Sequence, residues 1–290
     1  MATTRIGLDR LPPAALTAVE EHTGSLLTVD ETAEGFNSEI AARITSATGT
    51  WHIKGLRTEH PRAWTQHREA AIAPFLTGLA PALRWRVEAA GWDILGFEAL
   101  TGHHADYAPG SPDLPEVAAL LRRLGETPCP GIELRHAEQR LEHYAAHPDD
   151  LRFFAGTHLL HTDLNNANVL VDAHAPQGDR ARLVDWAWAT RGAAWLDAGY
   201  WIIWLIAAGH APASAEHWAA EIPSWHTAPA EGITAFAAAN HNLWSEISNG
   251  DPDPWALRLT TAATAWHAHQ SWLSRTLRPA RQDQQRCEKK

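Results

Sequence analysis

The sequence predicts a two-lobed α+β fold, with an N-lobe of antiparallel sheet plus helices and a mainly helical C-lobe. Three observations predict it. Short strand-like segments joined by Gly- and Thr-rich turns occupy residues 25–99. Amphipathic, helix-like segments dominate after residue 114. Between them, HHADYAPGSPD (103–113) reads as a Pro- and Gly-rich linker. We therefore expect an N-lobe over 1–102, a C-lobe over 103–280 and a polar tail over 281–290.

The expected N-lobe elements follow from their patterns. A helix over 11–22 begins at a Pro-Pro pair, a common helix start. Another helix, over 61–79, has an apolar side. The expected strands are 25–29, 39–44, 50–56, 84–89 and 92–99. The expected C-lobe helices are 114–124, 134–146, 194–208, 214–222, 230–248 and 254–277.

Two stretches of the C-terminal half carry the chemistry, LLHTDLNNANVLV and ARLVDWAW. In them a short apolar strand leads to His161-x-Asp163, Asn168 follows five positions after the Asp, and a later strand ends at Asp185. Transfer of a terminal phosphoryl group needs such a set: one carboxylate to accept the proton of an attacking hydroxyl, and oxygen ligands for Mg²⁺. A buried turn with a capping Asp explains any one of these residues, but not all of them in this order.

Lysine usage supports the same chemistry. The chain has three lysines, and two of them are the last two residues. The third, Lys54, lies in the expected strand GTWHIKGL, where a compact ammonium would meet the α- and β-phosphates of a nucleotide. Glu69, one helix later, is its expected carboxylate partner, with Glu59 as the rival. The alternative for Lys54 is a surface lysine on an edge strand.

The two stretches resemble the aminoglycoside phosphotransferase family, the small-molecule branch of the protein-kinase-like fold. The loop of that family usually reads His-Gly-Asp-Leu-His-Pro-Gly-Asn, and its metal strand usually ends in Asp-Trp-Glu. This chain reads His-Thr-Asp-Leu-Asn-Asn-Ala-Asn from His161 to Asn168, and Asp-Trp-Ala from Asp185. The base and metal positions are intact, while Thr162 and Ala187 depart from the family pattern.

The resemblance implies a role for each position. Asp163 would be the catalytic residue, and Asn168 and Asp185 would hold Mg²⁺. ATP or GTP would be the phosphoryl donor. His161 and Asp197 would brace the catalytic loop without touching the acceptor.

The resemblance also implies a nucleotide site in the N-lobe. The turn ETAEGFNSE stands where a phosphate-covering loop belongs, although it has a single glycine. The backbone N–H groups of Phe36, Asn37 and Ser38 could cradle phosphate oxygens there, with a plain hairpin turn as the alternative. The strand ending near residue 99 leads into the hinge, where a purine would bond to the backbone of Glu98 and Leu100.

Composition limits the partners. The formal charge of −10 argues against nucleic acid. No apolar run is long enough to span a membrane. Two cysteines, one of them in the polar tail, and no visible signal peptide fit a cytoplasmic protein. We expect a monomer or homodimer that binds a nucleoside triphosphate and a small-molecule acceptor.

The acceptor is expected to be a small molecule, because twelve positions separate Asp185 from Asp197 and leave no room for a peptide-docking segment. Of 15 tryptophans, 11 lie at or after position 186, in a region with few acidic residues. Trp186, Trp201 and Trp204 could therefore contact a ring-rich acceptor, with core packing as the alternative.

The sequence thus favours an antibiotic as acceptor, a nucleoside (such as the capuramycin type) or a macrolide over an aminoglycoside, with resistance by inactivation. One alternative is a metabolic kinase for choline, a sugar or an amino acid. Another, of a different class, is a nucleotide-binding scaffold without catalysis.

Overall fold

The structure is a computed structural model that describes residues 5–31 and 38–287, with side chains described through Thr276 of the last helix. The chain forms two compact units. The first contains residues 1–103, 130–132 and 170–189, and the second contains the rest. The N-terminal stretch of the first unit ends at residue 103, and the chain returns to this unit for residues 170–189.

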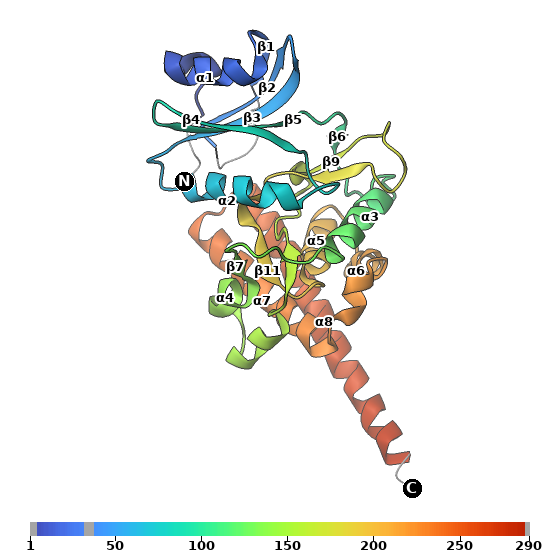
Figure 1. Ribbon diagram of the computed structural model, residues 1–290. Helices are drawn as coiled ribbons and strands as arrows, with labels where there is room; N and C mark the ends of the chain where they lie inside the picture. Colours follow the sequence, from blue (N-terminus) through green and yellow to red (C-terminus); the bar gives the residue numbers. More distant parts are fainter. Residues whose placement is uncertain (1–4, 32–37, 288–290) are drawn as a thin grey trace. The chain divides into compact units, whose positions relative to one another are not determined.

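The first unit is built on a five-stranded antiparallel sheet with the strand order β1-β2-β3-β5-β4. The strands are β1 (Leu26–Glu31), β2 (Ile40–Ser46), β3 (Gly49–Arg57), β4 (Leu83–Ala89) and β5 (Trp92–Glu98). Alternate residues such as Ile44, Ile53 and Ile94 are fully buried on one face. Helix α1 (Pro13–Thr23) lies over this face, and α2 (Ala63–Ile72) lies on the opposite side of the sheet (Figure 1).

Close packing in the core of the first unit explains why one strand position is a glycine. The indole of Trp85 packs so closely over Gly96 of β5 that an added Cβ would lie 2.0 Å from the ring. Helix α2 is shorter than the predicted 61–79 because Pro74 cannot donate a helical hydrogen bond. The chain continues instead as a short 3-10 helix over Ala73–Phe75.

The second unit is mainly helical. Its helices are α3 (Leu114–Gly125), α4 (Ala137–Leu141), α5 (Leu196–Ala207), α6 (Pro212–Ala220), α7 (Ala230–Gly250) and α8 (Pro254–Cys287). Helices α7 and α8 pack against each other, and α5 packs against both α6 and α8 (Figure 1). The core contains the fully buried rings of Phe154, Trp201, Phe236 and Trp266.

Short strands frame the motif segments. One three-stranded sheet has the order β7-β11-β8, from β7 (Arg135–His136), β8 (His158–Leu160) and β11 (Thr190–Gly192). Another has the order β10-β9-β6, from β6 (His103–His104), β9 (Val169–Val171) and β10 (Ala181–Leu183). Further 3-10 helices span 8–10, 142–144, 148–153, 166–168, 186–188 and 223–227.

Two of the predicted C-lobe helices also need correction. The segment 134–146 is not one helix, because its first residues pair with β11 and only Ala137–Leu141 is α-helical. The last helix does not end near residue 277 but continues to Cys287. Within the described residues, no helix is both long enough and apolar enough to cross a membrane.

Candidate functional site

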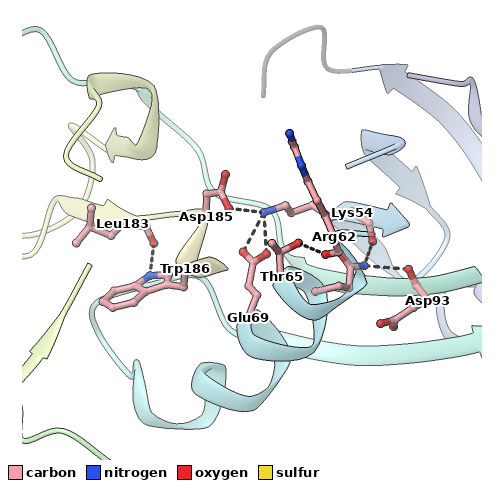
Figure 2. Close-up of polar contacts among 9 residues, drawn as sticks. Lys54, Arg62, Thr65, Glu69, Asp93, Leu183, Asp185 and Trp186 are labelled. Atoms are coloured by element: carbon pink, nitrogen blue, oxygen red, sulfur yellow. Dashed lines mark hydrogen bonds and ion pairs between the residues drawn. The ribbon is translucent and has the colours of Figure 1, made fainter. Parts of the chain in front are cut away.

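The first unit brings together three of the predicted site residues, Lys54, Glu69 and Asp185. The Nζ atom of Lys54 on β3 lies 2.8 and 3.0 Å from the two carboxylate oxygens of Glu69 on α2. The same atom lies 3.2 Å from Oδ1 of Asp185, 131 positions later in the chain (Figure 2). Glu59, the rival partner, is exposed in the turn before α2. The ammonium therefore bridges the two carboxylates.

The charges of this trio are set by burial and by one another. Burial alone would lower the pKa of Lys54, but Asp185 and Glu69 outweigh it and raise the pKa above its ordinary value. Burial raises the pKa of Glu69 against the attraction of Lys54, and the charge of Asp185 adds to the rise. Lys54 is thus held firmly as a cation between two carboxylates that repel each other.

Helix α2 also fixes the backbone around Lys54. Gln66, three residues before Glu69 and on the same side of the helix, donates to the carbonyl of Lys54 and to that of Asp93 on β5, both at 2.9 Å. One helix therefore positions both the partner carboxylate and the strand that carries the lysine.

Asp185 occupies a strained position. Its backbone is left-handed, with φ 61° and ψ 64°, a conformation that a residue other than glycine adopts at a cost and typically at functional sites. The following Trp186 is buried, and its indole N–H donates to the carbonyl of Leu183 at 3.1 Å. The bend directs the Asp185 carboxylate toward Lys54.

Two backbone groups of the predicted base-binding segment bond within the first unit. The N–H of Glu98 donates to Ala82 at 2.9 Å, and the carbonyl of Leu100 accepts from the guanidinium of Arg43 at 3.0 Å. In the predicted phosphate loop, Ser38 is buried, whereas Phe36 and Asn37 lie outside the described residues.

The second unit holds the catalytic loop in a fixed shape. Asp197, at the start of α5, accepts the backbone N–H of His161 through one carboxylate oxygen and that of Thr162 through the other, both at 2.8 Å. Asp197 and His161 are both buried. Thr162 has φ 69°, so these two bonds hold a left-handed residue immediately before Asp163. The two bonds fix the backbone immediately before Asp163.

Within the loop, Asp163 and Asn168 are also linked. The amide nitrogen of Asn168 donates to the carbonyl of Asp163 at 3.2 Å, so the amide oxygen is the end that a metal ion would use. The N–H of Asn165 donates to the carboxylate of Asp163 at 3.3 Å, and the N–H of Asp163 donates to Nδ1 of His161 at 3.3 Å. The loop thus forms a compact network around its carboxylate.

Sequence reasoning missed one residue at this loop, Arg140 of α4. Its guanidinium donates to the hydroxyls of Thr162 and Thr190 at 2.6 Å each, and Asp163 and Asp197 lie near enough to act on its pKa. The available signal was Thr162 itself, because a hydroxyl in place of the usual glycine requires a partner when it is buried.

The tryptophans predicted to contact the acceptor lie in the cores. Trp186, Trp201 and Trp204 are 2%, 0% and 7% exposed, and Trp201 packs edge-on against Tyr107 and Trp218. Their apolar area is already removed from water, so core packing, the alternative interpretation, describes all three.

Comparison with known proteins supports the fold. No protein-family model and no curated protein sequence matches the chain. Among solved structures, choline kinase LicA from Streptococcus pneumoniae is similar, with a TM-score of 0.57 and 14% identity over 87% of this chain and 98% of that one. The GDP complex of aminoglycoside 2'-phosphotransferase-IIIa has a TM-score of 0.56 and 11% identity over 88% and 97%.

A macrolide 2'-phosphotransferase of type I has a TM-score of 0.52 and 14% identity over 86% of this chain and 94% of that one. All three are kinases of small molecules by their printed names, and at these identities the likeness concerns the fold. The chain therefore has the protein-kinase-like fold of the aminoglycoside phosphotransferases, as its two motif stretches predict.

Proposed function

We propose that this protein is a nucleotide-dependent O-phosphotransferase that phosphorylates a hydroxyl group of a small molecule. The observation that carries the proposal is the contact of Lys54 with both Glu69 and Asp185, which are distant in sequence. A surface lysine on an edge strand would have no reason to hold two carboxylates from separate elements. In phosphoryl transfer the arrangement has a purpose, since it places one ammonium beside a metal carboxylate.

The residues divide the chemistry among themselves. Lys54 binds the α- and β-phosphates. Asp163 orients the acceptor hydroxyl and takes its proton as the oxygen bonds to the γ-phosphorus and the bond to the leaving nucleoside diphosphate breaks. The amide oxygen of Asn168 and the carboxylate of Asp185 are hard oxygen donors, which suit Mg²⁺. When bound, Mg²⁺ would neutralise charge on the phosphates.

Asp197 and Arg140 would act through the loop, not on the substrates. Asp197 bonds to the two residues immediately before Asp163, and Arg140 bonds to Thr162. Both would keep the carboxylate of Asp163 aimed at the acceptor. They are positioning residues in this proposal.

For the acceptor, we propose a neutral or weakly charged antibiotic, a nucleoside or macrolide in preference to an aminoglycoside, inactivated in the cytoplasm. The support is the scarcity of acidic residues after position 198, where six occur before residue 281. Carboxylates would be needed there to hold a polycation. The buried Trp186, Trp201 and Trp204 no longer count toward this preference.

A metabolic small-molecule kinase is the second candidate. It is favoured by the similarity of the fold to choline kinase LicA and to a microcompartment-associated aminopropanol kinase, which has a TM-score of 0.57 and 15% identity. A nucleotide-binding scaffold without catalysis is the third. The presence of Lys54, Asp163, Asn168 and Asp185 together argues against it.

A turnover screen tests these proposals. ATP and GTP would be supplied with Mg²⁺ and a panel of nucleoside, macrolide and aminoglycoside antibiotics, choline, sugars and amino alcohols. Release of nucleoside diphosphate would be coupled to a chromogenic reaction and products checked for a gain of one phosphoryl group by mass spectrometry. The Asp163→Asn variant is the control. Tight nucleotide binding with no phosphorylated product across the panel would favour the scaffold.

Salt dependence would distinguish the acceptor classes. A neutral acceptor held by apolar contacts should keep its KM as ionic strength rises, because salt screens charge pairs and not buried apolar area. A polycation held by carboxylates should lose affinity steeply. An aminoglycoside as best acceptor, with a salt-sensitive KM, would overturn the nucleoside-or-macrolide preference.

A further inference from the structure

The N-terminal segment runs beside the end of the sheet that carries Lys54. The N–H of Ile6 donates to the carbonyl of Glu39 at 2.9 Å, and the N–H of Glu39 donates to the carbonyl of Gly55 at 2.9 Å. Gly55 directly follows Lys54 on β3. In the described residues, β1 pairs with β2 only as far as Ala42. The N-terminal segment therefore lies beside the start of β2, where β1 no longer pairs with that strand. This is the end of the sheet at which we expect the phosphates of the nucleotide to bind.

The side chains of Ile6 and Arg5 in this segment lie toward opposite faces of the sheet. Ile6 packs against the core between the sheet and α1, together with Leu8 and Ile40. Lys54 lies on the other face of the sheet, since its neighbour Ile53 belongs to that core. The side chain preceding Ile6, Arg5, acts electrostatically on Asp185, which contacts Lys54. Arg5 is therefore near the face that carries Lys54, and two of its guanidinium nitrogens are buried.

The surroundings of His52 support the same position for Arg5. His52, two residues before Lys54 on β3, points to the same face by strand alternation. Burial, together with the charges of Lys54, Arg5 and Arg43, lowers the pKa of His52 to about 4. Arg5 thus lies within electrostatic reach of both the histidine and the metal carboxylate.

The nucleotide site needs positive charge in addition to that of Lys54. Lys54 is shared between two carboxylates, so the trio is net negative before any phosphate arrives. The expected phosphate loop has only one glycine, which is unusual for a loop whose backbone must approach phosphates closely. A guanidinium supplies two parallel donors that match phosphate oxygens.

We propose that Arg5 is a second phosphate-binding residue, supplied by the N-terminal segment to the same nucleotide site as Lys54. This inference rests on the proposed function. In it, the guanidinium bonds to the phosphate chain of the nucleotide, while Lys54 remains between Glu69 and Asp185. The nucleoside portion of the ligand makes no contact with Arg5.

Calorimetric titration of Arg5→Ala tests the proposal, with any purification tag at the C-terminus so that the N-terminal segment keeps its native surroundings. Affinity for ATP or GTP should fall about 10- to 100-fold, the loss expected for a charged hydrogen bond. Affinity for adenosine or guanosine, measured by competition, should stay within about twofold. Arg5→Lys should show an intermediate loss, because a point charge replaces the fork.

Arg10→Ala is the matched control, since Arg10 is an exposed cation of the same segment and its loss should leave affinity unchanged. Unchanged triphosphate affinity in Arg5→Ala would overturn the inference and leave the proposed function intact. Tighter binding would also overturn it, by showing that Arg5 competes with the nucleotide for Asp185. If Arg5→Ala loses affinity for the nucleoside and for the triphosphate equally, the role of Arg5 is structural and the inference is overturned. Failure of the wild-type protein to bind any nucleotide would refute both proposals.

Discussion

Replacing Lys54 with Met should destabilise the first unit as well as abolish activity. The ammonium lies 2.8 Å from Glu69 and 3.2 Å from Asp185, and the Lys54 and Glu69 side chains are only 13% and 7% exposed. Removing it leaves two carboxylates facing each other with little access to water. Breaking a buried ion pair in this way costs about 3–5 kcal/mol. We therefore expect the free energy of unfolding to fall by about 3 kcal/mol near pH 8.

The deficit should shrink at acid pH. Burial and the charge of Asp185 already raise the pKa of Glu69, and without Lys54 only a hydrogen bond from the backbone of Trp186 opposes them. A raised pKa in the folded state means that the folded protein binds the proton more tightly than the unfolded chain. Stability of Lys54→Met should therefore rise relative to wild type as the pH falls through that raised pKa.

Urea denaturation at several pH values, followed by tryptophan fluorescence, measures this effect. The double variant Lys54→Met/Glu69→Gln should recover stability to within about 1 kcal/mol of wild type, because the uncompensated charge is gone, but should not recover turnover. Arg84→Met is the control in the same sheet, where the exposed ion pair with Glu98 contributes less than about 1 kcal/mol. A loss below 1 kcal/mol in Lys54→Met, or no rescue in the double variant, would refute the reasoning.

Four further predictions concern single residues. Asp163→Ala should reduce turnover by about 100-fold or more while nucleotide affinity, measured by calorimetry, stays within a few-fold, because the residue meets the acceptor. Asp185→Asn should weaken nucleotide binding about tenfold or more, and only when Mg²⁺ is present; an unchanged Mg²⁺ dependence would show that the metal site is misplaced. Arg140→Met should lower kcat and leave nucleotide affinity unaltered, since the hydroxyls that it releases, those of Thr162 and Thr190, belong to the catalytic loop and to β11; parallel losses would point to general unfolding. Because the pKa of His52 is lowered to about 4, the unfolded state binds more protons between pH 4 and 6.5, and stability should rise with pH across that window. His52→Asn should flatten this rise by up to about 3 kcal/mol in pH-dependent denaturation, and an unchanged slope would contradict the lowered pKa.

Local patterns predicted most of the first unit. The five strands occur within a few residues of their expected bounds, because alternating apolar residues and turn residues specify strands locally. The contact of Lys54 with Glu69 was also predictable, since the order of elements in a kinase-like fold places that helix beside that strand.

Other features depended on contacts that local patterns do not contain. Segment 134–146 has good helical residues, but pairing of Arg135 and His136 with β11 replaces its first turn. Thr162 indicated that a buried hydroxyl needs a partner but not that Arg140 supplies it, because Thr162 and Thr190 are distant from Arg140 in sequence. Whether tryptophans at helical spacing fill a core or line a site depends on the neighbouring helices, which the spacing does not specify.

The return of residues 170–189 to the first unit has a consequence for splitting the protein into fragments. A single cut after residue 103 would leave Lys54 and Glu69 without Asp185, and would remove the backbone hydrogen bond from Leu183 to Leu79. A self-sufficient first unit needs the returning segment to be joined back. An added Cβ on Gly102 would lie 2.2 Å from the carbonyl of Val171, so the two chain points are neighbours and a short glycine linker could connect them. The resulting miniature protein would show whether the first unit binds a nucleotide without the second.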